Sequence, residues 1–239
     1  IQKVLLLGMG GSSLAPEVLQ KVFKEEGGDK NTHIRRNNPI EFATLDSTDP
    51  AQVISAAGDF PPRESVYLVS SKSGGTEEVK ALAEYFWTIS GKDGSRFVAI
   101  TDPGTSLDSL AEARSFRTTL LADPTVGGRF SVFSAFGLLP MKLMGIEPIK
   151  MLESASVMMD ECKGNISSGR NPGLALGAVL GEAALAGRNK LTLIADPELA
   201  AFGSWLEQLI AESTGKKGKG IVVIDGETTA GPSQFQDDR

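Results

Sequence analysis

Short apolar runs alternate with helix-patterned segments through the first half of the chain. Each run is rich in Val, Ile, Leu or Phe, and the segment after it places apolar residues at helical spacing. The expected strands are Lys3–Leu7, Phe42–Leu45, Val66–Val69, Arg96–Ile100 and Phe116–Leu121. Strands that alternate with helices are joined by right-handed crossovers, which produce a parallel sheet with helices on both faces. The pattern therefore predicts an α/β domain with a doubly wound, five-stranded parallel sheet in a three-layer αβα arrangement.

The pattern changes after residue 147. Residues 148–188 are helical in pattern and rich in Gly and Ala, which permit close helix packing. A new strand, Leu191–Ala195, and a helix, Pro197–Glu212, then begin what we interpret as a second α/β unit. We expect a first domain over residues 1–147, a helical connection over 148–188, and the incomplete start of a second domain over 189–239. Because the chain opens on Ile1, without a methionine and directly at its first strand, we expect it to be part of a longer polypeptide.

Composition narrows the class of protein. The 239 residues are 41% hydrophobic and 23% charged, as in ordinary globular proteins, and the net charge is −6. An acidic chain lacks the clustered Lys and Arg that a nucleic-acid surface requires. No apolar run has the length of a membrane helix, and no signal peptide is visible. The single cysteine, Cys162, cannot form an internal disulfide, which suits the reducing cytoplasm.

The segment Val66–Glu78 (V-Y-L-V-S-S-K-S-G-G-T-E-E) combines a buried strand, a polar turn and the start of a helix. Hydroxyl residues, a lysine and two glycines at the carboxyl end of a strand surround one point with donors and with the positive end of a helix. Such a point suits a phosphate group. The alternative is that the Ser and Thr residues only cap the helix.

Two other turns carry candidate chemistry. Gly8–Ser13 (G-M-G-G-S-S) resembles a dinucleotide fingerprint loosely, because Ser13 stands at the third glycine position and Asp46 is too distant to be the usual acidic partner. Its glycines better suit backbone approach to a sugar phosphate, with Ser12 as a donor. In the second turn, Arg129 follows two glycines and could hold a developing oxyanion, or could be an ordinary surface arginine.

Glu212 is the candidate base. It falls two helical turns after Trp205, nearly in line with the apolar face of its predicted helix, so we expect a carboxylate on the buried side. Partial desolvation would raise its pKa toward the range useful for a general base. The alternative is a carboxylate at a frayed helix end, or one paired with Lys216 or Lys217.

Four motifs in the same order resemble the phosphoglucose isomerase family. They are V-L-L-L-G-M-G-G-S-S-L-A-P, S-S-K-S-G-G-T-E-E, V-G-G-R-F-S-V-F-S-A-F-G-L-L-P and Q-L-I-A-E-S-T-G-K. The chain is particularly similar to the isomerase part of bifunctional transaldolase/glucose-6-phosphate isomerases. The resemblance covers essentially the whole chain. It implies the sugar-isomerase (SIS) fold, which a complete enzyme contains twice.

The resemblance also implies roles for individual residues. Arg129 would stabilise an enediolate, Glu78 would help to organise the site, and Glu212 would move a proton between C2 and C1. The implied substrate-binding residues are Gly11, Ser12, Ser71, Lys72 through its backbone, Ser73, Thr76, Glu78 and Gly128. The implied reaction interconverts glucose 6-phosphate and fructose 6-phosphate without a metal or organic cofactor, in a cytoplasmic homodimer.

The chain departs from the family pattern at several positions. Ser73 and Gly75 stand where the family usually has Thr, and Ser13 and Ala15 alter the first motif. The family's ring-opening histidine, which a neighbouring subunit supplies, and its C-terminal lysine belong to a segment that this chain lacks. His33, the only histidine, matches neither. We therefore expect weak activity from the isolated chain, and we keep a non-catalytic SIS module that binds phosphosugars as the alternative.

Overall fold

The computed structural model describes residues 1–23, 40–164, 166–167 and 169–227. The chain divides into two compact units, Ile1–Glu147 and Pro148–Arg239, and each is described by itself. His33 lies outside the described residues. Among those that are described, no helix is both long and apolar enough to cross a membrane.

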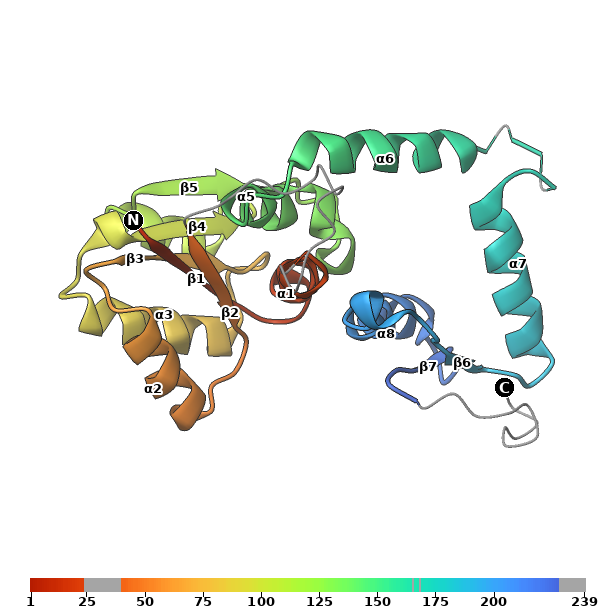
Figure 1. Ribbon diagram of the computed structural model, residues 1–239, viewed down its shortest axis with the longest axis horizontal. Helices are drawn as coiled ribbons and strands as arrows, with labels where there is room; N and C mark the ends of the chain where they lie inside the picture. The colour runs from red at the N-terminus through yellow and green to blue at the C-terminus, as the bar shows by residue number, and fades with distance from the viewer. Residues whose placement is uncertain (24–39, 165, 168, 228–239) are drawn as a thin grey trace. The chain divides into compact units, whose positions relative to one another are not determined.

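The first unit is built on a five-stranded parallel sheet with the order β2-β1-β3-β4-β5 (Figure 1). The strands are β1 (Lys3–Gly8), β2 (Glu41–Leu45), β3 (Ser65–Ser70), β4 (Phe97–Thr101) and β5 (Thr118–Leu121). All four pairings are parallel. The predicted α/β class and five-stranded parallel sheet are confirmed, with small shifts at the strand ends.

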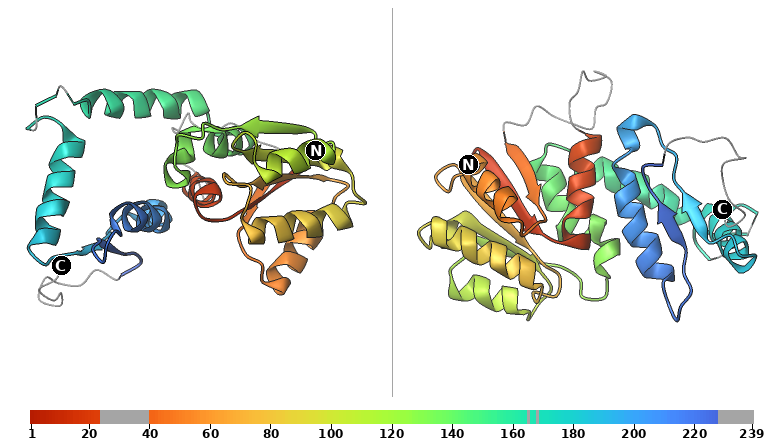
Figure 2. Two further views of the ribbon diagram at one scale, coloured as in Figure 1. Left: turned by 180° about the vertical axis from the view of Figure 1, so that it is seen from behind. Right: turned by 90° about the horizontal axis from the view of Figure 1, so that it is seen from below.

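Helices cover both faces of this sheet. They are α1 (Leu14–Val22), α2 (Pro50–Asp59), α3 (Glu77–Ile89), α4 (Ser106–Ala113) and α5 (Ala135–Leu143), with single-turn or short 3-10 helices η1 (Gly10–Ser12), η2 (Gly94–Arg96) and η3 (Gly128–Phe133). Right-handed crossovers place α1 on one face, because the chain moves from β1 outward to β2. The same rule places α2, α3 and α4 on the other face, because the chain then moves the opposite way. Figures 1 and 2 show this division, with α5 beside α1.

The core follows the two-residue period of the strands. Leu5, Leu7, Tyr67, Val69 and Phe97 point to one face and form a cluster with buried residues of α2, α3 and α4. The hydroxyl group of Tyr67 donates to the carbonyl oxygen of Phe60 at 2.8 Å, so its polar end is satisfied. Burial raises the pKa of Tyr67 above its usual range. The sheet is therefore a rigid base for the turns at its carboxyl edge.

The second unit contains helices and a small sheet. Its elements are α6 (Pro148–Glu161), α7 (Pro172–Leu185), β6 (Lys190–Thr192), η4 (Pro197–Leu199), α8 (Phe202–Thr214) and β7 (Val222–Ile224). β6 and β7 pair in parallel. The sequence pattern predicted a longer sixth strand and one continuous helix from Pro197, and it did not indicate β7. That this unit begins a second SIS domain stays a prediction.

Candidate functional site

Three turns meet at the carboxyl edge of the first sheet, where the strand order reverses. The chain leaves β1 toward β2 and leaves β3 toward β4, so the turns after β1 and β3 flank the reversal. In open parallel sheets this is where ligands bind. Gly8 and Ser70, the last residues of β1 and β3, are register partners. The Ser70 hydroxyl donates to the carbonyl oxygen of Ser12 at 3.2 Å, which joins the two turns directly.

The turn after β3, residues Ser71–Thr76, forms a compact cradle. Its first residue, Ser71, is buried, and the Oγ atom lies 3.3 Å from Oγ1 of Thr76. At the middle of the turn, Gly74 has a φ of +65°, and a Cβ there would lie 2.7 Å from Cβ of Thr105. Glycine is therefore required for the path that brings the two hydroxyl groups together. Ser73 is exposed, and its Oγ accepts from the amide of Gly75 at 3.2 Å.

Thr76 occupies the N-cap position of α3, yet its side chain makes no capping hydrogen bond. The capping interpretation is therefore wrong for this residue, and its hydroxyl group faces Ser71 instead. The cap of α4 shows the contrast, because the Thr105 hydroxyl accepts from the amide of Asp108 at 3.2 Å. The positive end of α3 thus opens at the cradle, which favours an anion there. Glu78 lies in the first turn of α3 and is exposed.

The first turn and the arginine turn are in close contact. A Cβ on Gly11 would lie 2.6 Å from the carbonyl carbon and oxygen of Gly128, so only glycine allows the two backbones to approach. Arg129, the next residue, is half-buried, and its guanidinium carbon lies 4.6 Å from the centre of the Phe130 ring. The Ser131 hydroxyl donates to the carbonyl oxygen of Gly128 at 2.6 Å and stabilises η3. Within the first unit, the structure therefore brings together all three turns that the sequence indicated.

The side chain of Lys72 does not join the hydroxyl groups of the cradle but contacts the loops after β4 and β5. Its ammonium group donates to both carboxylate oxygens of Asp102, at 2.7 and 2.6 Å, and to the main-chain carbonyl oxygen of Asp123 at 3.0 Å. The family resemblance implied a backbone role only for Lys72, and the sequence did not indicate Asp102 or Asp123 as its partners. No spacing in the sequence signals this contact. Hydrogen bonds from the side chain and amide of Thr125 lower the pKa of Asp123, and the charge of Lys72 acts in the same direction.

Glu212 differs from the expectation. It lies near the end of α8 in the second unit and is exposed, whereas helical phase predicted a buried carboxylate. The described residues of this unit that are buried are only Asn171, Gly203 and Val223. The apolar face of α8 therefore has little within its own unit to pack against. Lys216 does approach Glu212, but its ammonium group donates to the main-chain carbonyl oxygen at 2.9 Å.

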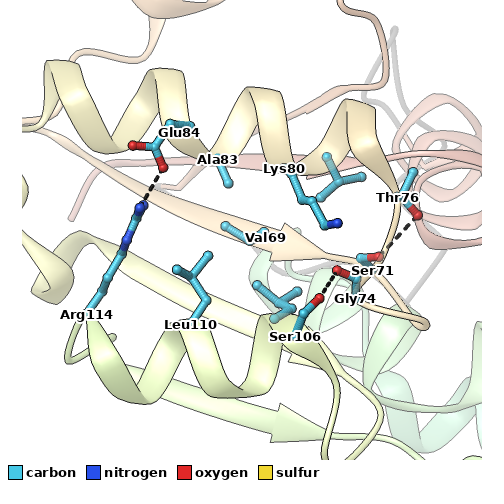
Figure 3. A pocket seen from close by; sticks show the side chains of 12 residues that line it. Val69, Ser71, Gly74, Thr76, Lys80, Ala83, Glu84, Ser106, Leu110 and Arg114 are labelled. Atoms are coloured by element: carbon cyan, nitrogen blue, oxygen red, sulfur yellow. Dashed lines mark hydrogen bonds and ion pairs between the residues drawn. The ribbon is translucent and has the colours of Figure 1, made fainter.

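A cavity of about 290 Å³ lies behind the cradle, between α3 and α4 (Figure 3). Ser71 and Thr76 line one end, where the Ser106 hydroxyl donates to the carbonyl oxygen of Gly74 at 2.6 Å. The ion pair of Arg114 with Glu84, at 2.6 Å, closes the other end. Its middle is apolar. Sequence reasoning did not identify this cavity, because α3 and α4 contribute to it from separate crossovers.

Comparisons with known proteins point to one family. The family model described as phosphoglucose isomerase matches residues 1–234. A glucose-6-phosphate isomerase of Geobacter sulfurreducens is 35% identical, with 96% of this chain and 44% of the relative covered. One of Prochlorococcus marinus is 32% identical, with 90% and 40% covered. The chain thus spans about two fifths of the length of these curated relatives.

The fold is also found in solved structures. The crystal structure of a glucose-6-phosphate isomerase from Chlamydia trachomatis superimposes with a TM-score of 0.76 at 23% identity, over 94% of this chain and 43% of that one. At that identity the likeness concerns the fold alone, an SIS-type α/β fold with a five-stranded parallel sheet.

Proposed function

The chain belongs to the phosphoglucose isomerase family, and from this premise we propose that the protein containing it interconverts glucose 6-phosphate and fructose 6-phosphate. The observation that carries the proposal is the meeting of three turns at the strand-order reversal, with the Ser71 and Thr76 hydroxyls 3.3 Å apart at the open end of α3. Two hydroxyls and the positive end of a helix provide donors for a phosphate group. These donors would bind the phosphate group of an extended hexose phosphate. C1 and C2, at the other end of the sugar, would then be accessible to the catalytic residues.

The proposed mechanism moves a proton between C2 and C1 of the open-chain sugar. Glu212 acts as the base that removes the proton from C2 and returns it to C1. The intermediate is an enediolate, whose negative oxygen needs a fixed positive charge nearby. The hydroxyl proton of O2 passes to O1 in the same sequence, so that the C1 aldehyde becomes an alcohol and C2 becomes the ketone. Arg129 supplies that charge, since a guanidinium stays protonated throughout. Glu78, at the start of α3, is proposed to organise the same site, and Gly11, Ser12, Ser73 and Gly128 complete the substrate contacts.

The family resemblance supports three further proposals about the whole protein. We propose that it is a homodimer, because the resemblance implies that the ring-opening histidine comes from a neighbouring subunit. We place it in the cytoplasm, where a single cysteine and a net charge of −6 are unremarkable. We also propose that a transaldolase part belongs to the same polypeptide. Size-exclusion chromatography and the full coding sequence test these statements.

The decisive variant is Glu212→Gln in the full-length protein, which keeps the shape of the side chain and removes the base. Loss of a general base lowers kcat by roughly 10²–10⁴-fold, whereas the phosphate contacts should keep the dissociation constant for glucose 6-phosphate within about threefold. Turnover is measured in both directions, and sugar-phosphate binding by calorimetry. Glu207→Gln is the matched control, because Glu207 is an exposed carboxylate on the same helix, and it should leave kcat unchanged.

The outcomes separate the two functions under consideration. Unchanged turnover in Glu212→Gln removes this residue as the base. A full-length wild-type protein that binds hexose phosphates without turning them over is instead a phosphosugar-binding regulatory module. The exposed position of Glu212 within its own unit makes this second function worth testing directly.

A further inference from the structure

The ammonium group of Lys72 has all its hydrogen-bond donors engaged away from the cradle. A lysine ammonium carries three N–H donors and no acceptor. In this structure the Nζ atom has three acceptors within hydrogen-bonding distance: the two carboxylate oxygens of Asp102, at 2.7 and 2.6 Å, and the carbonyl oxygen of Asp123, at 3.0 Å. The three donors are therefore matched by protein oxygens, although Lys72 stands between Ser71 and Ser73 in the proposed phosphate turn.

The contacts of Lys72 join three strand ends. Lys72 follows β3, Asp102 follows β4, and Asp123 follows β5 and precedes the turn that carries Arg129. Main-chain bonds run alongside the side-chain ones, since the amide of Asp102 donates to the carbonyl oxygen of Lys72 at 3.2 Å. The side chain thus fixes the cradle relative to the arginine turn.

The ion pair is well shielded from water. Only 18% of the Lys72 side chain and 15% of the Asp102 side chain are exposed. Removing one partner from such a pair leaves the other charge without compensation in a poorly solvated place, which is more costly than the loss of a surface pair. A disturbance at either residue is therefore expected to move both loops, the one after β3 and the one after β4.

We propose that Lys72 is a positioning residue, which holds the phosphate cradle in register with the Arg129 turn and does not contact the phosphate through its side chain. This inference rests on the proposed function, because it concerns the same cradle. It contrasts with the simpler idea that a lysine in a phosphate turn binds the phosphate. The two ideas predict opposite effects for the neutralisation of Asp102.

A double-mutant cycle on the full-length protein tests the proposal. The variants are Lys72→Met, Asp102→Asn and the pair together, and the dissociation constants for inorganic phosphate and glucose 6-phosphate are measured by calorimetry. If Lys72 positions the cradle, each single variant weakens binding by about tenfold or more. The double variant is then no weaker than the worse single one, because both changes disrupt one contact.

Direct phosphate binding by Lys72 predicts a different result. Asp102→Asn would then free the ammonium group and leave binding equal or stronger, while Lys72→Met would weaken it. That result overturns the proposal. Even if Lys72→Met fails to fold, the change in phosphate affinity in Asp102→Asn distinguishes the two ideas: weaker binding supports positioning, and equal or stronger binding supports direct contact. Asn matches Asp in shape and carries no charge.

The pair of Lys3 with Glu41 is the matched control. It also joins a lysine to a carboxylate, at 3.1 Å, and to a main-chain carbonyl, that of Asp59 at 2.7 Å, but it lies at the amino ends of the strands. Lys3→Met and Glu41→Gln should lower Tm without changing phosphate affinity. If they weaken phosphate binding as strongly as the Lys72 variants, the effect is general destabilisation and the proposal fails.

The two proposals fail separately in this design. If the variants change phosphate affinity as predicted but the wild-type protein does not isomerise hexose phosphates, only the isomerase function is refuted. Isomerase activity with tighter phosphate binding in Asp102→Asn refutes the positioning role alone.

Discussion

Gly11 allows two turns of the candidate site to come into contact because it has no side chain. It lies in η1, and its backbone approaches Gly128 so closely that a Cβ would come within 2.6 Å of the carbonyl carbon and oxygen. The contact connects the turn after β1 to the turn that carries Arg129. From the sequence, Gly11 and Gly128 were expected to bring the backbone close to a substrate. The structure adds that they approach each other.

We expect Gly11→Ala to destabilise the first unit by about 1–3 kcal/mol, as overpacking usually does, and to displace Arg129. Phosphate binding and turnover should both fall, and urea denaturation measures the stability. Gly58→Ala is the control, because Gly58 lies in α2, where an added methyl group would have no atom within 4 Å. Alanine there should stabilise the helix by roughly 0.5–1 kcal/mol. Equal effects of the two variants would contradict the proposed contact.

At the scale of elements, α3 and α4 each have a threonine at the N-cap position, and the two threonines make different contacts. Thr105 caps α4 with its hydroxyl group, whereas Thr76 at the start of α3 directs its hydroxyl group to Ser71. The sequence left capping and phosphate binding as alternatives, because both need a hydroxyl residue before a helix. The structure shows that Thr76 does not cap α3 and that its hydroxyl group faces Ser71, beyond the turn through Gly74, while phosphate binding stays a prediction.

Replacing threonine by valine should therefore have different consequences at positions 76 and 105. Thr76→Val should lower the free energy of unfolding by only about 0.5–1 kcal/mol, because it removes the contact with Ser71 but no helix cap, and should weaken phosphate binding by about tenfold. Thr105→Val should cost more, about 1–2 kcal/mol, because the amide of Asp108 loses its acceptor and the buried Thr101 hydroxyl loses a hydrogen-bond partner. Denaturant titration and calorimetry measure the two effects. A larger loss of stability at Thr76 than at Thr105 would support the capping role after all.

At the scale of the whole chain, burial is concentrated in the first unit. Among the described residues, nearly all buried apolar side chains lie before residue 148, and Val223 is the exception. α6 and α7 contain no buried residue, although α7 is strongly apolar. A helix that is apolar on all sides is stable only when other structure covers it.

We therefore expect residues 1–147 to fold alone and residues 148–239 not to do so. The first fragment should unfold in one cooperative transition, followed by circular dichroism, while the second should show no transition and should bind a hydrophobic dye. A cooperative transition in the second fragment would show that it buries its apolar faces by itself and would contradict this expectation.

Much of the first unit could be predicted from the sequence, and the reasons are local. The strands were visible because alternation with helical segments marks a parallel sheet, and the turn Ser71–Thr76 was visible as a candidate phosphate site because its hydroxyls, glycines and lysine are consecutive. β7 was missed because it is only three residues long, in a segment rich in Gly and Lys. Glu212 was assigned to a buried face because helical phase shows which residues share a face, but not whether anything covers that face.

The sequence alone determined the class of fold, the position of the candidate turns and the family, since these depend on the order of residues along the chain. Tertiary structure decided which turns touch. The contact of Gly11 with Gly128 and the ion pair of Lys72 with Asp102, thirty positions apart, exist because strand order places β1, β3, β4 and β5 side by side. Pairing of distant strands sets these contacts, and no local pattern of residues encodes them.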